Sequence, residues 1–400
     1  MTGPSDDRMP TDPVGFVVGR DGVAGGPRAA RGSRMVRCPI CMDLTAWPDG
    51  RTAWRWDAKT SLYQLEDLSK LDPARRNDEL RRSYQPCDNP SATPDAPKHY
   101  LPATYGFFDD PLVVGLVGAS QSGKSHLLTA MIREVMRGGL SPYGLVVEPL
   151  DFRRHDEFRR NHLVPFERGE QLTGTGYGVT EYAESLVLRG PTGVHPLIFF
   201  DVAGEELQQP DDRGRVGRFL VAVNALLFVH APEDALTQRE VEERTGRSSV
   251  GYEDEAFRAS LSRVTAGNPH HTAIPAVVAV TKSDRLRFRP PADFWLRRGS
   301  ESTVNAARIR AESRDVYAFL HATGAQAALD PFEVFDRCAL HFVSASGGDV
   351  AVGSRRGVMN GATGSFPRGV RPRRVLEPLV SILAMAGVLP GSESEKVGLP

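Results

Sequence analysis

The stretch Pro111–Met131, PLVVGLVGASQSGKSHLLTAM, decides how the rest of the chain is interpreted. Its apolar run from Leu112 to Val117 is typical of a short buried strand. Gly118 to Ser125 then fit the pattern GxxxxGK[ST], and the apolar residues that follow are spaced as on one face of a helix. The motif therefore stands in the setting that a phosphate-binding loop needs, between a strand and a helix.

The residue types in this loop suit a triphosphate. Gly118 and Gly123 allow a tight turn with no Cβ between the backbone and a phosphate. Lys124 adds positive charge for the β- and γ-phosphates, and Ser125 offers its hydroxyl to Mg²⁺. The residues expected to bind the phosphates, many through backbone amides, are Gly118, Ala119, Ser120, Gln121, Ser122, Gly123, Lys124 and Ser125. The alternative is a glycine-rich turn that binds nothing.

A second apolar run starts at Pro196 and ends in Asp201-Val-Ala-Gly204-Glu205. A carboxylate at the carboxyl end of a strand next to a phosphate loop can hold Mg²⁺, directly or through water. Gly204 offers a backbone N–H to a γ-phosphate. The quartet DxxG alone is common in turns, but after a strand and downstream of a phosphate loop it indicates a nucleotide site.

A third buried strand is expected over Ala273–Val280, and it ends in Thr281-Lys282-Ser283-Asp284. The Asp284 carboxylate can accept two hydrogen bonds from guanine, one from N1–H and one from the exocyclic amine. Adenine has an acceptor at N1, so it would leave the buried charge unpaired. The stem of Lys282 can lie over the base plane, and Thr281 stands where such motifs usually carry Asn.

A fourth apolar run, Ala339–Val343, is followed by Ser344-Ala345-Ser346. The backbone N–H of Ala345 is placed to meet the guanine O6. Such a short signal means nothing alone, and it corroborates the others only because it comes fourth, in order.

The order of these motifs resembles the translation-factor-related class of GTPases, which share a Ras-like G domain. More narrowly, the chain resembles the prokaryotic double-GTPase domain family, second type. That resemblance runs from about Cys38 to the C-terminus and rests on CPIC, Cys87 with the later HYLP, GASQSGKS, FFDVAGE and VTKSD. It implies an α/β, three-layer P-loop NTPase fold that binds GTP or GDP with Mg²⁺. It also implies a cysteine-containing module before the GTPase domain, and a role in bacterial signalling or conflict systems.

A switch threonine should complete the Mg²⁺ site in the GTP state, between Ser125 and Asp201. Segment 171–180 is glycine-rich, and its Thr173 and Thr175 are near-equal candidates, with Thr180 third. A flexible loop with incidental threonines remains the alternative.

Glu205 stands where Ras-like enzymes place a water-orienting Gln. A carboxylate beside the γ-phosphate is repelled by it. We therefore expect slow GTP hydrolysis, with Lys124, Gly204 and Glu205 as the catalytic residues. A protein partner or a second GTPase subunit would complete the site.

The N-terminal third contains Cys38-Pro-Ile-Cys41, a spacing that can place two thiolates on one metal ion. Cys87 and His99 are the nearest further ligands and would complete a structural Cys₃His zinc site. Two alternatives stay open: a redox pair of thiols, or a knuckle that no longer binds metal.

The expected domains are a disordered tail (1–34), a cysteine-containing module with its linker (35–102), a GTPase domain (103–390) and a frayed tail (391–400). Within the GTPase domain, a strand is expected over Phe219–Val229 and an amphipathic helix over Ser302–Leu320. Val375–Val388 is expected to form a last helix that covers the sheet.

The net charge of −1 and pI near 6.8 give no reason to expect nucleic acid or an anionic membrane as a partner. No apolar run reaches the roughly 18 residues that span a bilayer. Four cysteines in 400 residues are not a disulfide framework, so the cytoplasm is the expected compartment. Two other functions stay open, a P-loop ATPase or kinase-like enzyme and a nucleotide-binding scaffold without turnover.

Overall fold

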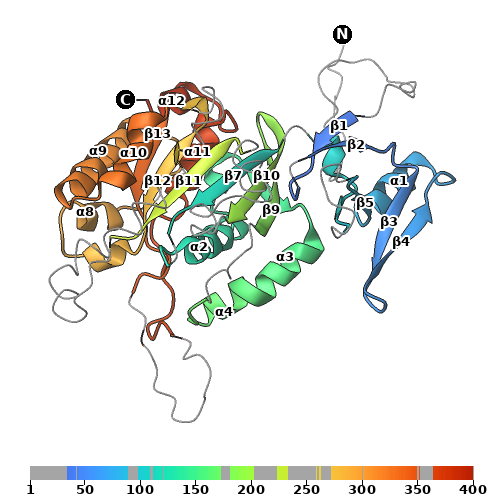
Figure 1. Ribbon diagram of the computed structural model, residues 1–400, viewed down its shortest axis with the longest axis horizontal. Helices are drawn as coiled ribbons and strands as arrows, with labels where there is room; N and C mark the ends of the chain where they lie inside the picture. The colour runs from blue at the N-terminus through green and yellow to red at the C-terminus, as the bar shows by residue number, and fades with distance from the viewer. Residues whose placement is uncertain are drawn as a thin grey trace, which may run out of the picture.

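The computed structural model describes residues 34–41, 43–88, 98–108, 111–119, 121–172, 181–201, 223–232, 258, 261–262, 272–299, 301–348, 351 and 364–399. For residues 181–183 and 201 it describes the backbone alone. Its largest element is a seven-stranded sheet with the order β13-β12-β11-β7-β10-β9-β8 (Figure 1). The strands are β7 (Leu112–Val117), β8 (Val146–Pro149), β9 (Glu181–Gly190), β10 (Gly193–Asp201), β11 (Ala225–His230), β12 (Ala276–Val280) and β13 (Cys338–Phe342).

Five neighbouring strands of this sheet, β13, β12, β11, β7 and β10, run parallel to one another. At the β10 side, β9 is antiparallel to both β10 and β8. All residues of β7, β11, β12 and β13 are buried, as expected of strands covered on both faces. The mixed α/β architecture expected from the apolar runs is confirmed.

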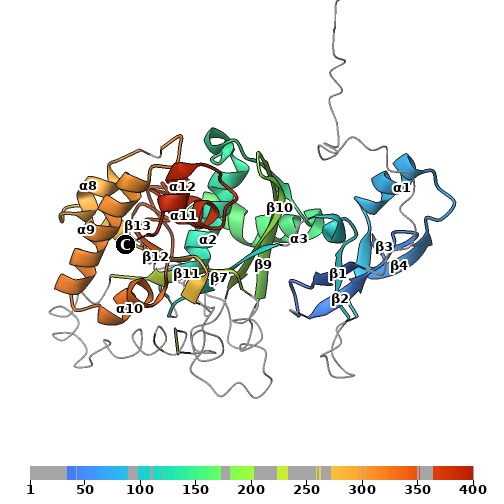
Figure 2. The same cartoon turned by 90° about the horizontal axis from the view of Figure 1, so that it is seen from above.

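Helices cover both faces of the sheet. Alternate side chains of β7 point to opposite faces, with Val114 and Leu116 on the side of α2 and α11, and Val113 and Val117 on the side of α9 and α10. Figure 2 shows this arrangement from above. The helices of this part of the chain are α2 (Lys124–Met136), α3 (Phe152–Phe158), α4 (Val164–Glu167), α8 (Ala292–Leu296), α9 (Ala306–Ala322), α10 (Gln326–Val334), α11 (Glu377–Met385) and α12 (Ser392–Lys396).

The N-terminal part forms two small sheets at one end of the molecule, beside α3 (Figures 1 and 2). One is the antiparallel pair β1 (Arg34–Arg37) and β2 (Leu44–Trp47). The other has the order β4-β3-β5-β6, with β3 (Thr52–Asp57), β4 (Leu62–Asp67), β5 (Tyr84–Pro86) and β6 (Tyr100–Pro102). Between β4 and β5 lies α1 (Pro73–Leu80), whose first turn is capped by Asp72.

Element boundaries differ from the expected ones by a few residues. The helix expected from Ser302 is α9, which begins at Ala306. The helix expected over Val375–Val388 is α11, which begins at Glu377 and ends at Met385. Of the strand expected over Phe219–Val229, residues 219–222 lie outside the described part of the chain, and β11 begins at Ala225. A cap sets the start of α9, where the side chain of Asn305 accepts from the N–H of Arg308.

The C-terminal residues differ from the expectation that they fray. Residues 392–396 form α12, and Val397 is 1% exposed. Arg337 holds this tail by donating to the carbonyl oxygens of Ser394 and Val397, and the N–H of Cys338 donates to the carbonyl of Gly398 at 2.9 Å. The polar residues of the tail suggested fraying, but the tail is held through its backbone carbonyl oxygens, which accept hydrogen bonds from Arg337 and Cys338.

A search of the described helices for a membrane-spanning segment gives a negative result: none combines the required length and apolar character.

Candidate functional site

The loop that follows β7 lies between the ends of β10 and β11, the two neighbours of β7. A Cβ on Gly118 would lie 2.3 Å from the carbonyl oxygen of Val229, so a side chain has no room there. Gly123 has φ of +95°, in the left-handed region that favours glycine. The backbone therefore needs glycine at both of the positions that the motif specifies.

Lys124 is the first residue of α2, and its side chain folds back over the loop. Its Nζ donates to the carbonyl oxygens of Gly118 at 2.7 Å and Ala119 at 3.0 Å. The residue is only 8% exposed, so the ammonium group is a buried positive charge at the start of a helix. The first N–H groups of a helix have no partner within it. Charge and helix N-terminus together make this loop suitable for an anion.

Ser122 and Ser125 complete the described part of the loop. The Ser122 hydroxyl is buried and has no hydrogen-bond partner among the described residues. Ser125 lies half-buried in the first turn of α2. Gln121 has φ of +63°, which for a residue other than glycine marks a strained turn.

Asp201 is the last residue of β10, and its backbone is in register with Leu116 of β7. Leu116 precedes Gly118 by two residues, so the end of β10 stands beside the start of the loop. Several predicted site residues lie outside the described part of the chain, namely Ser120, Thr173, Thr175, Thr180, Gly204 and Glu205.

Thr281 joins the end of β12 to the loop after β7. Its Oγ1 donates to the carbonyl oxygen of Ser122 at 2.5 Å, and its N–H donates to the carbonyl of His230 at 2.8 Å. The Thr281 side chain is 2% exposed. A Cβ on Gly123 would lie 3.5 Å from the same hydroxyl. The third predicted motif therefore touches the first one directly.

Asp284 and Ser344 come from the ends of two neighbouring strands, β12 and β13. The Ser344 hydroxyl donates to Asp284 Oδ1 at 2.5 Å and accepts from the N–H of Gly347 at 2.9 Å. Asp284 is 7% exposed and Ser344 is fully buried. The hydrogen bond fixes one carboxylate oxygen and leaves the orientation of the group well defined.

Lys282 and Ala345 flank this pair. Lys282 has φ of +49°, so the chain turns sharply between Thr281 and the short helix that contains Asp284. Ala345 follows Ser344 directly and is 8% exposed. Because parallel strands end at the same edge of a sheet, the structure brings all of these described residues to one edge.

A second site lies in the N-terminal part, where Cys38, Cys41, Cys87 and His99 come together. One candidate ligand atom from each residue lies within 4.8 Å of every other. The Sγ atoms of Cys41 and Cys87 are 3.7 Å apart, and Cys38 Sγ is 3.0 Å from His99 Nε2. Tetrahedral zinc with Zn–S bonds of about 2.3 Å requires sulfurs about 3.8 Å apart. The four residues thus fit a Cys₃His metal site.

The backbone around this cluster is built for a sulfur ligand. The N–H of Ile40 donates to Cys38 Sγ at 3.3 Å, which orients the sulfur within the Cys38–Cys41 turn. The N–H of Cys87 donates to the carbonyl of His99 at 3.1 Å, which places the second pair side by side. Burial raises the pKa of the Cys38 thiol well above its ordinary value, because a thiolate there has no water to solvate it. A bound cation would stabilise the negative charge of the Cys38 thiolate in place of water.

The cysteine-containing module packs on the part of the chain that forms the seven-stranded sheet, through contacts that were not expected from the sequence. The Tyr84 hydroxyl donates to Asp151 Oδ1 at 3.0 Å, and Asp151 also caps α3 by accepting from two backbone N–H groups. Arg153 donates to the hydroxyl of Tyr63 and lies 4.9 Å from the ring centre of Trp56. Arg153 belongs to a segment dense in charged residues, which would by itself suggest a solvated helix, but here it contacts the module.

His126 is a further residue that sequence reasoning did not select. It follows Ser125 on α2, and its Nε2 accepts from the N–H of Leu172 at 3.2 Å. Its ring stands edge-on to Phe166 and Phe366. Burial, aided by the charge of Lys282, lowers the pKa of His126 to about 4, so the imidazole is neutral near pH 7. The hydrogen bond from Leu172 to His126 therefore connects α2 to the residue immediately before the segment with the expected switch threonines.

Comparisons with known proteins give little. No protein-family model and no curated protein matches the chain. Among solved structures, one match is entitled "Crystal structure of bacterial selenocysteine-specific elongation factor EF-Sec", with 14% sequence identity and a TM-score of 0.23. The match covers 59% of this chain and 26% of that one, so this chain spans about a quarter of its length. At this TM-score the likeness carries no argument about fold or function.

Proposed function

We propose that this protein binds GTP with Mg²⁺ and hydrolyses it slowly as a molecular switch. The observation that carries the proposal is a set of contacts at one edge of the sheet. Lys124 and the N–H of Ser122 both donate to the carbonyl of Ala119, Thr281 donates to the carbonyl of Ser122, and Ser344 donates to Asp284, three residues after Thr281. A buried ammonium group and a buried carboxylate thus lie at the same edge of the sheet, which supports the proposal. Those are the two groups that a guanosine triphosphate needs, one at its phosphates and one at its base.

Each residue has a chemical task in this proposal. The amides of the loop 118–123 and the first turn of α2 bind the phosphates. Lys124 leaves the carbonyl oxygens of Gly118 and Ala119 when the β- and γ-phosphates offer a stronger, charged acceptor. Ser125 and the side chain of Asp201 bind Mg²⁺, with Thr173 or Thr175 completing its coordination in the GTP state.

At the base, Asp284 accepts from guanine N1–H and the exocyclic amine, and the N–H of Ala345 meets O6. Lys282 lies over the base plane. Ser344 holds the Asp284 carboxylate by donating to Oδ1. Because Asp284 is almost fully buried, a purine with an acceptor at N1 leaves its charge without a donor.

Hydrolysis transfers the γ-phosphoryl group to water, and Lys124, Mg²⁺ and the amide of Gly204 would stabilise the charge that develops on it. Glu205 is a poor water-orienting group beside that charge. We therefore propose slow turnover, with a protein partner or a second GTPase subunit completing the site. Cytoplasmic location and a role in bacterial signalling or conflict systems belong to the same proposal.

The decisive experiment compares binding of GTP, ATP and xanthosine triphosphate to the full chain and to Asp284→Asn. Each lost hydrogen bond to the charged group costs about 1.5–3 kcal/mol, so GTP affinity should fall by about a hundredfold. Xanthosine triphosphate should gain, because its oxygen at position 2 accepts from the new amide. Asp293→Asn on α8, where Asp293 pairs with Arg297, is the matched control and should leave all three affinities unchanged.

The same experiment separates the two alternatives. A P-loop ATPase or kinase-like enzyme would prefer ATP and would not respond to Asp284→Asn. A scaffold without turnover would bind GTP selectively yet release no phosphate in a single-turnover assay. If no purine triphosphate binds in the presence of magnesium, the proposal fails altogether.

A further inference from the structure

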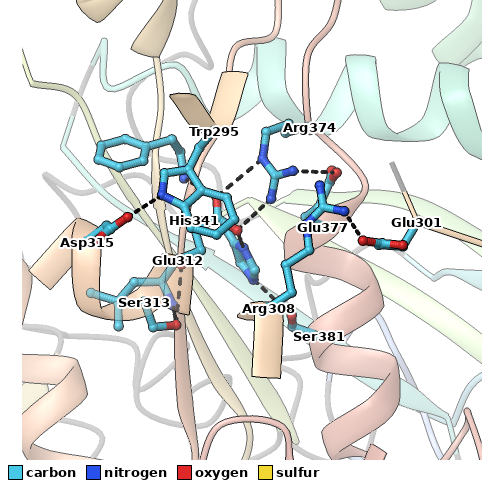
Figure 3. A network of polar contacts seen from close by, with 12 residues as sticks. Trp295, Glu301, Arg308, Glu312, Ser313, Asp315, His341, Arg374, Glu377 and Ser381 are labelled. Carbon is cyan, nitrogen blue, oxygen red and sulfur yellow. Dashed lines mark hydrogen bonds and ion pairs between the residues drawn. The ribbon is translucent and has the colours of Figure 1, made fainter. Parts of the chain in front are cut away.

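Glu312, on α9, holds the end of β13. Its side chain is 1% exposed, its Oε1 accepts from the N–H of Phe342 at 3.2 Å, and its Oε2 lies 2.7 Å from Nδ1 of His341. Figure 3 shows this carboxylate in the middle of a buried polar network. The imidazole of His341 in turn meets the hydroxyl of Ser381 on α11, at 2.9 Å.

The same carboxylate also holds Arg374, which belongs to a segment that returns to the sheet from residue 364. Arg374 donates from Nη2 to Glu312 Oε2 at 2.5 Å and from Nε to Oε1 at 3.3 Å (Figure 3). Its Nη1 pairs with Glu377 at 3.3 Å, and its guanidinium lies 5.6 Å from the ring of Trp295. Bidentate contact of this kind fixes geometry as well as charge.

Arg374 has φ of +56° and is 6% exposed, so its backbone is in a region that costs free energy for any residue except glycine. Such a conformation persists only when its surroundings determine it. Glu312 is the residue that holds Arg374 in this conformation, because removing either partner would leave a buried charge uncompensated. Burial by itself raises the pKa of Glu312, but His341 and Arg374 together hold it below its ordinary value.

The Glu312–Arg374 pair therefore forms a closure, which joins the two ends of one excursion of the chain. This excursion leaves β13 after Phe342 and comes back at Arg374, and Glu312 binds both of these ends. Directly inside the closure, Ser344 and Arg373 exchange two backbone hydrogen bonds of 3.0 and 2.8 Å. The N–H of Arg371 donates to the carbonyl of Ser346 at 2.7 Å.

The returning segment 371–373 thus lies against residues 344–346 as a short antiparallel partner. A Cβ on Gly347 would come within 2.3 Å of the carbonyl oxygen of Arg371, so the two segments are in close contact. Ser344 is the residue whose hydroxyl donates to Asp284. A contiguous series of contacts consequently runs from Glu312 and Arg374 through Arg373 to Ser344 and the Asp284 carboxylate.

We propose that Glu312 and Arg374 are positioning residues of the base site, which fix Ser344 and thereby aim Asp284 at a guanine edge. The inference rests on the proposed function, since it specifies how that site distinguishes its base. Neither residue touches the nucleotide. They restrict the conformational freedom of residues 344–346 before the nucleotide binds. Less conformational entropy is therefore lost when the base binds.

The first test uses Arg374→Lys, which keeps the charge but not the bidentate contact, and Glu312→Gln, which keeps the shape but not the charge. Affinity is measured for GTP, for inosine triphosphate, which lacks the exocyclic amine, and for inorganic tripolyphosphate. We expect GTP affinity to fall about tenfold and the preference for GTP over inosine triphosphate to shrink, while tripolyphosphate affinity stays within about twofold.

Arg308→Lys is the matched control, because Arg308 lies in the same network but donates to Glu301 and to the carbonyl of Gly299. It should leave the base preference unchanged. A general loss of stability would lower all three affinities together. Equal losses for GTP and tripolyphosphate in Arg374→Lys, or an unchanged base preference in both variants, overturn the inference.

A second measurement needs no variant, so it holds even if the buried substitutions prevent folding. Coupling between two sites is reciprocal. Guanine binding must therefore stabilise the closure, and GTP should slow amide hydrogen exchange at Phe342 and Arg373 more than tripolyphosphate does. Equal protection by the two ligands contradicts the inference.

The outcomes also distinguish this inference from the proposed function. If the unmodified protein does not prefer GTP over ATP, the proposed function fails first. If it prefers GTP, and both variants and the exchange data show no link to residues 312 and 374, only the positioning role is wrong.

Discussion

The hydroxyl of Thr281 donates a 2.5 Å hydrogen bond to the carbonyl oxygen of Ser122, so the turn after β12 supports the loop after β7. Both residues are buried, with Ser122 fully so. Thr281 thus makes this connection with a single hydroxyl.

Thr281→Val removes this donor at nearly constant volume, whereas Thr281→Ser keeps it. A buried carbonyl that loses its donor costs about 1–3 kcal/mol. We expect Thr281→Val to lower the free energy of unfolding by that amount and to weaken GTP and tripolyphosphate binding alike, by about tenfold. Urea unfolding and titration calorimetry measure the two effects. If Thr281→Ser is equally impaired, the hydroxyl is not responsible.

Metal content tests the cluster of Cys38, Cys41, Cys87 and His99. The intact protein is expected to retain about one zinc ion per chain after dialysis, by the ligand geometry described above. Cys87→Ser should lose it, and a strong chelator should lower the melting temperature of the intact protein but not of the variant.

The control for that experiment is Cys338→Ser, since Cys338 is equally buried but lies in β13, outside the cluster. It should keep the metal whatever its stability. Retention of zinc by Cys87→Ser, or a metal-free intact protein purified with zinc present, would argue for a redox pair or a knuckle that binds no metal.

The contact between Tyr84 and Asp151 predicts that the cysteine-containing module adds to the free energy of unfolding. Asp151→Ala loses a helix cap and also the partner of a buried tyrosine hydroxyl, so we expect a cost of about 2–4 kcal/mol. Asp72→Ala on α1 loses only an exposed cap, at about 1 kcal/mol. Chemical denaturation compares the two. Equal costs would show that the tyrosine contact adds nothing.

Two imidazoles, of His126 and His230, are expected to lower the stability of the fold in acid. Burial lowers the pKa of both His126 and His230 to about 4. The unfolded chain takes up these protons first, near pH 6.5, so stability is complete above that pH and is lost as the pH falls toward 4.

Each imidazole should contribute on the order of 2 kcal/mol to this loss. His126→Asn keeps an acceptor for the N–H of Leu172 but does not titrate, so its unfolding free energy should depend less on pH between 6.5 and 4. Urea midpoints at a series of pH values measure the slope. An unchanged slope would mean that His126 is not protonated on unfolding.

Much of the sheet could be predicted because its strands are continuous apolar runs. Leu112–Val117 is β7, the run ending in Asp201 is β10, and the residues before Thr281 are β12. The helix after the loop was also predicted with its buried face, since Leu127, Leu128, Met131 and Ile132 are all buried. A strand enclosed on both faces leaves this signature regardless of its neighbours.

The contacts that place the site were not predictable in the same way. Glu312, His341 and Arg374 are 29 to 62 residues apart, and each is a polar residue that sequence reasoning assigns to the surface. Only the fold makes them partners. His99 was a candidate ligand because of its residue type, but its placement beside Cys38 depends on the pairing of β5 with β6.

The arrangement of the tail has a consequence for self-association. β13 is an outermost strand of the seven-stranded sheet, and an exposed strand border invites another chain to add a strand to it. Here the amide of Cys338 is already occupied by Gly398, and Arg337 binds the backbone around it. The segment after the last helix therefore covers one end of this outer strand, and we expect its removal to leave the amide of Cys338 open to pairing with a strand of another chain.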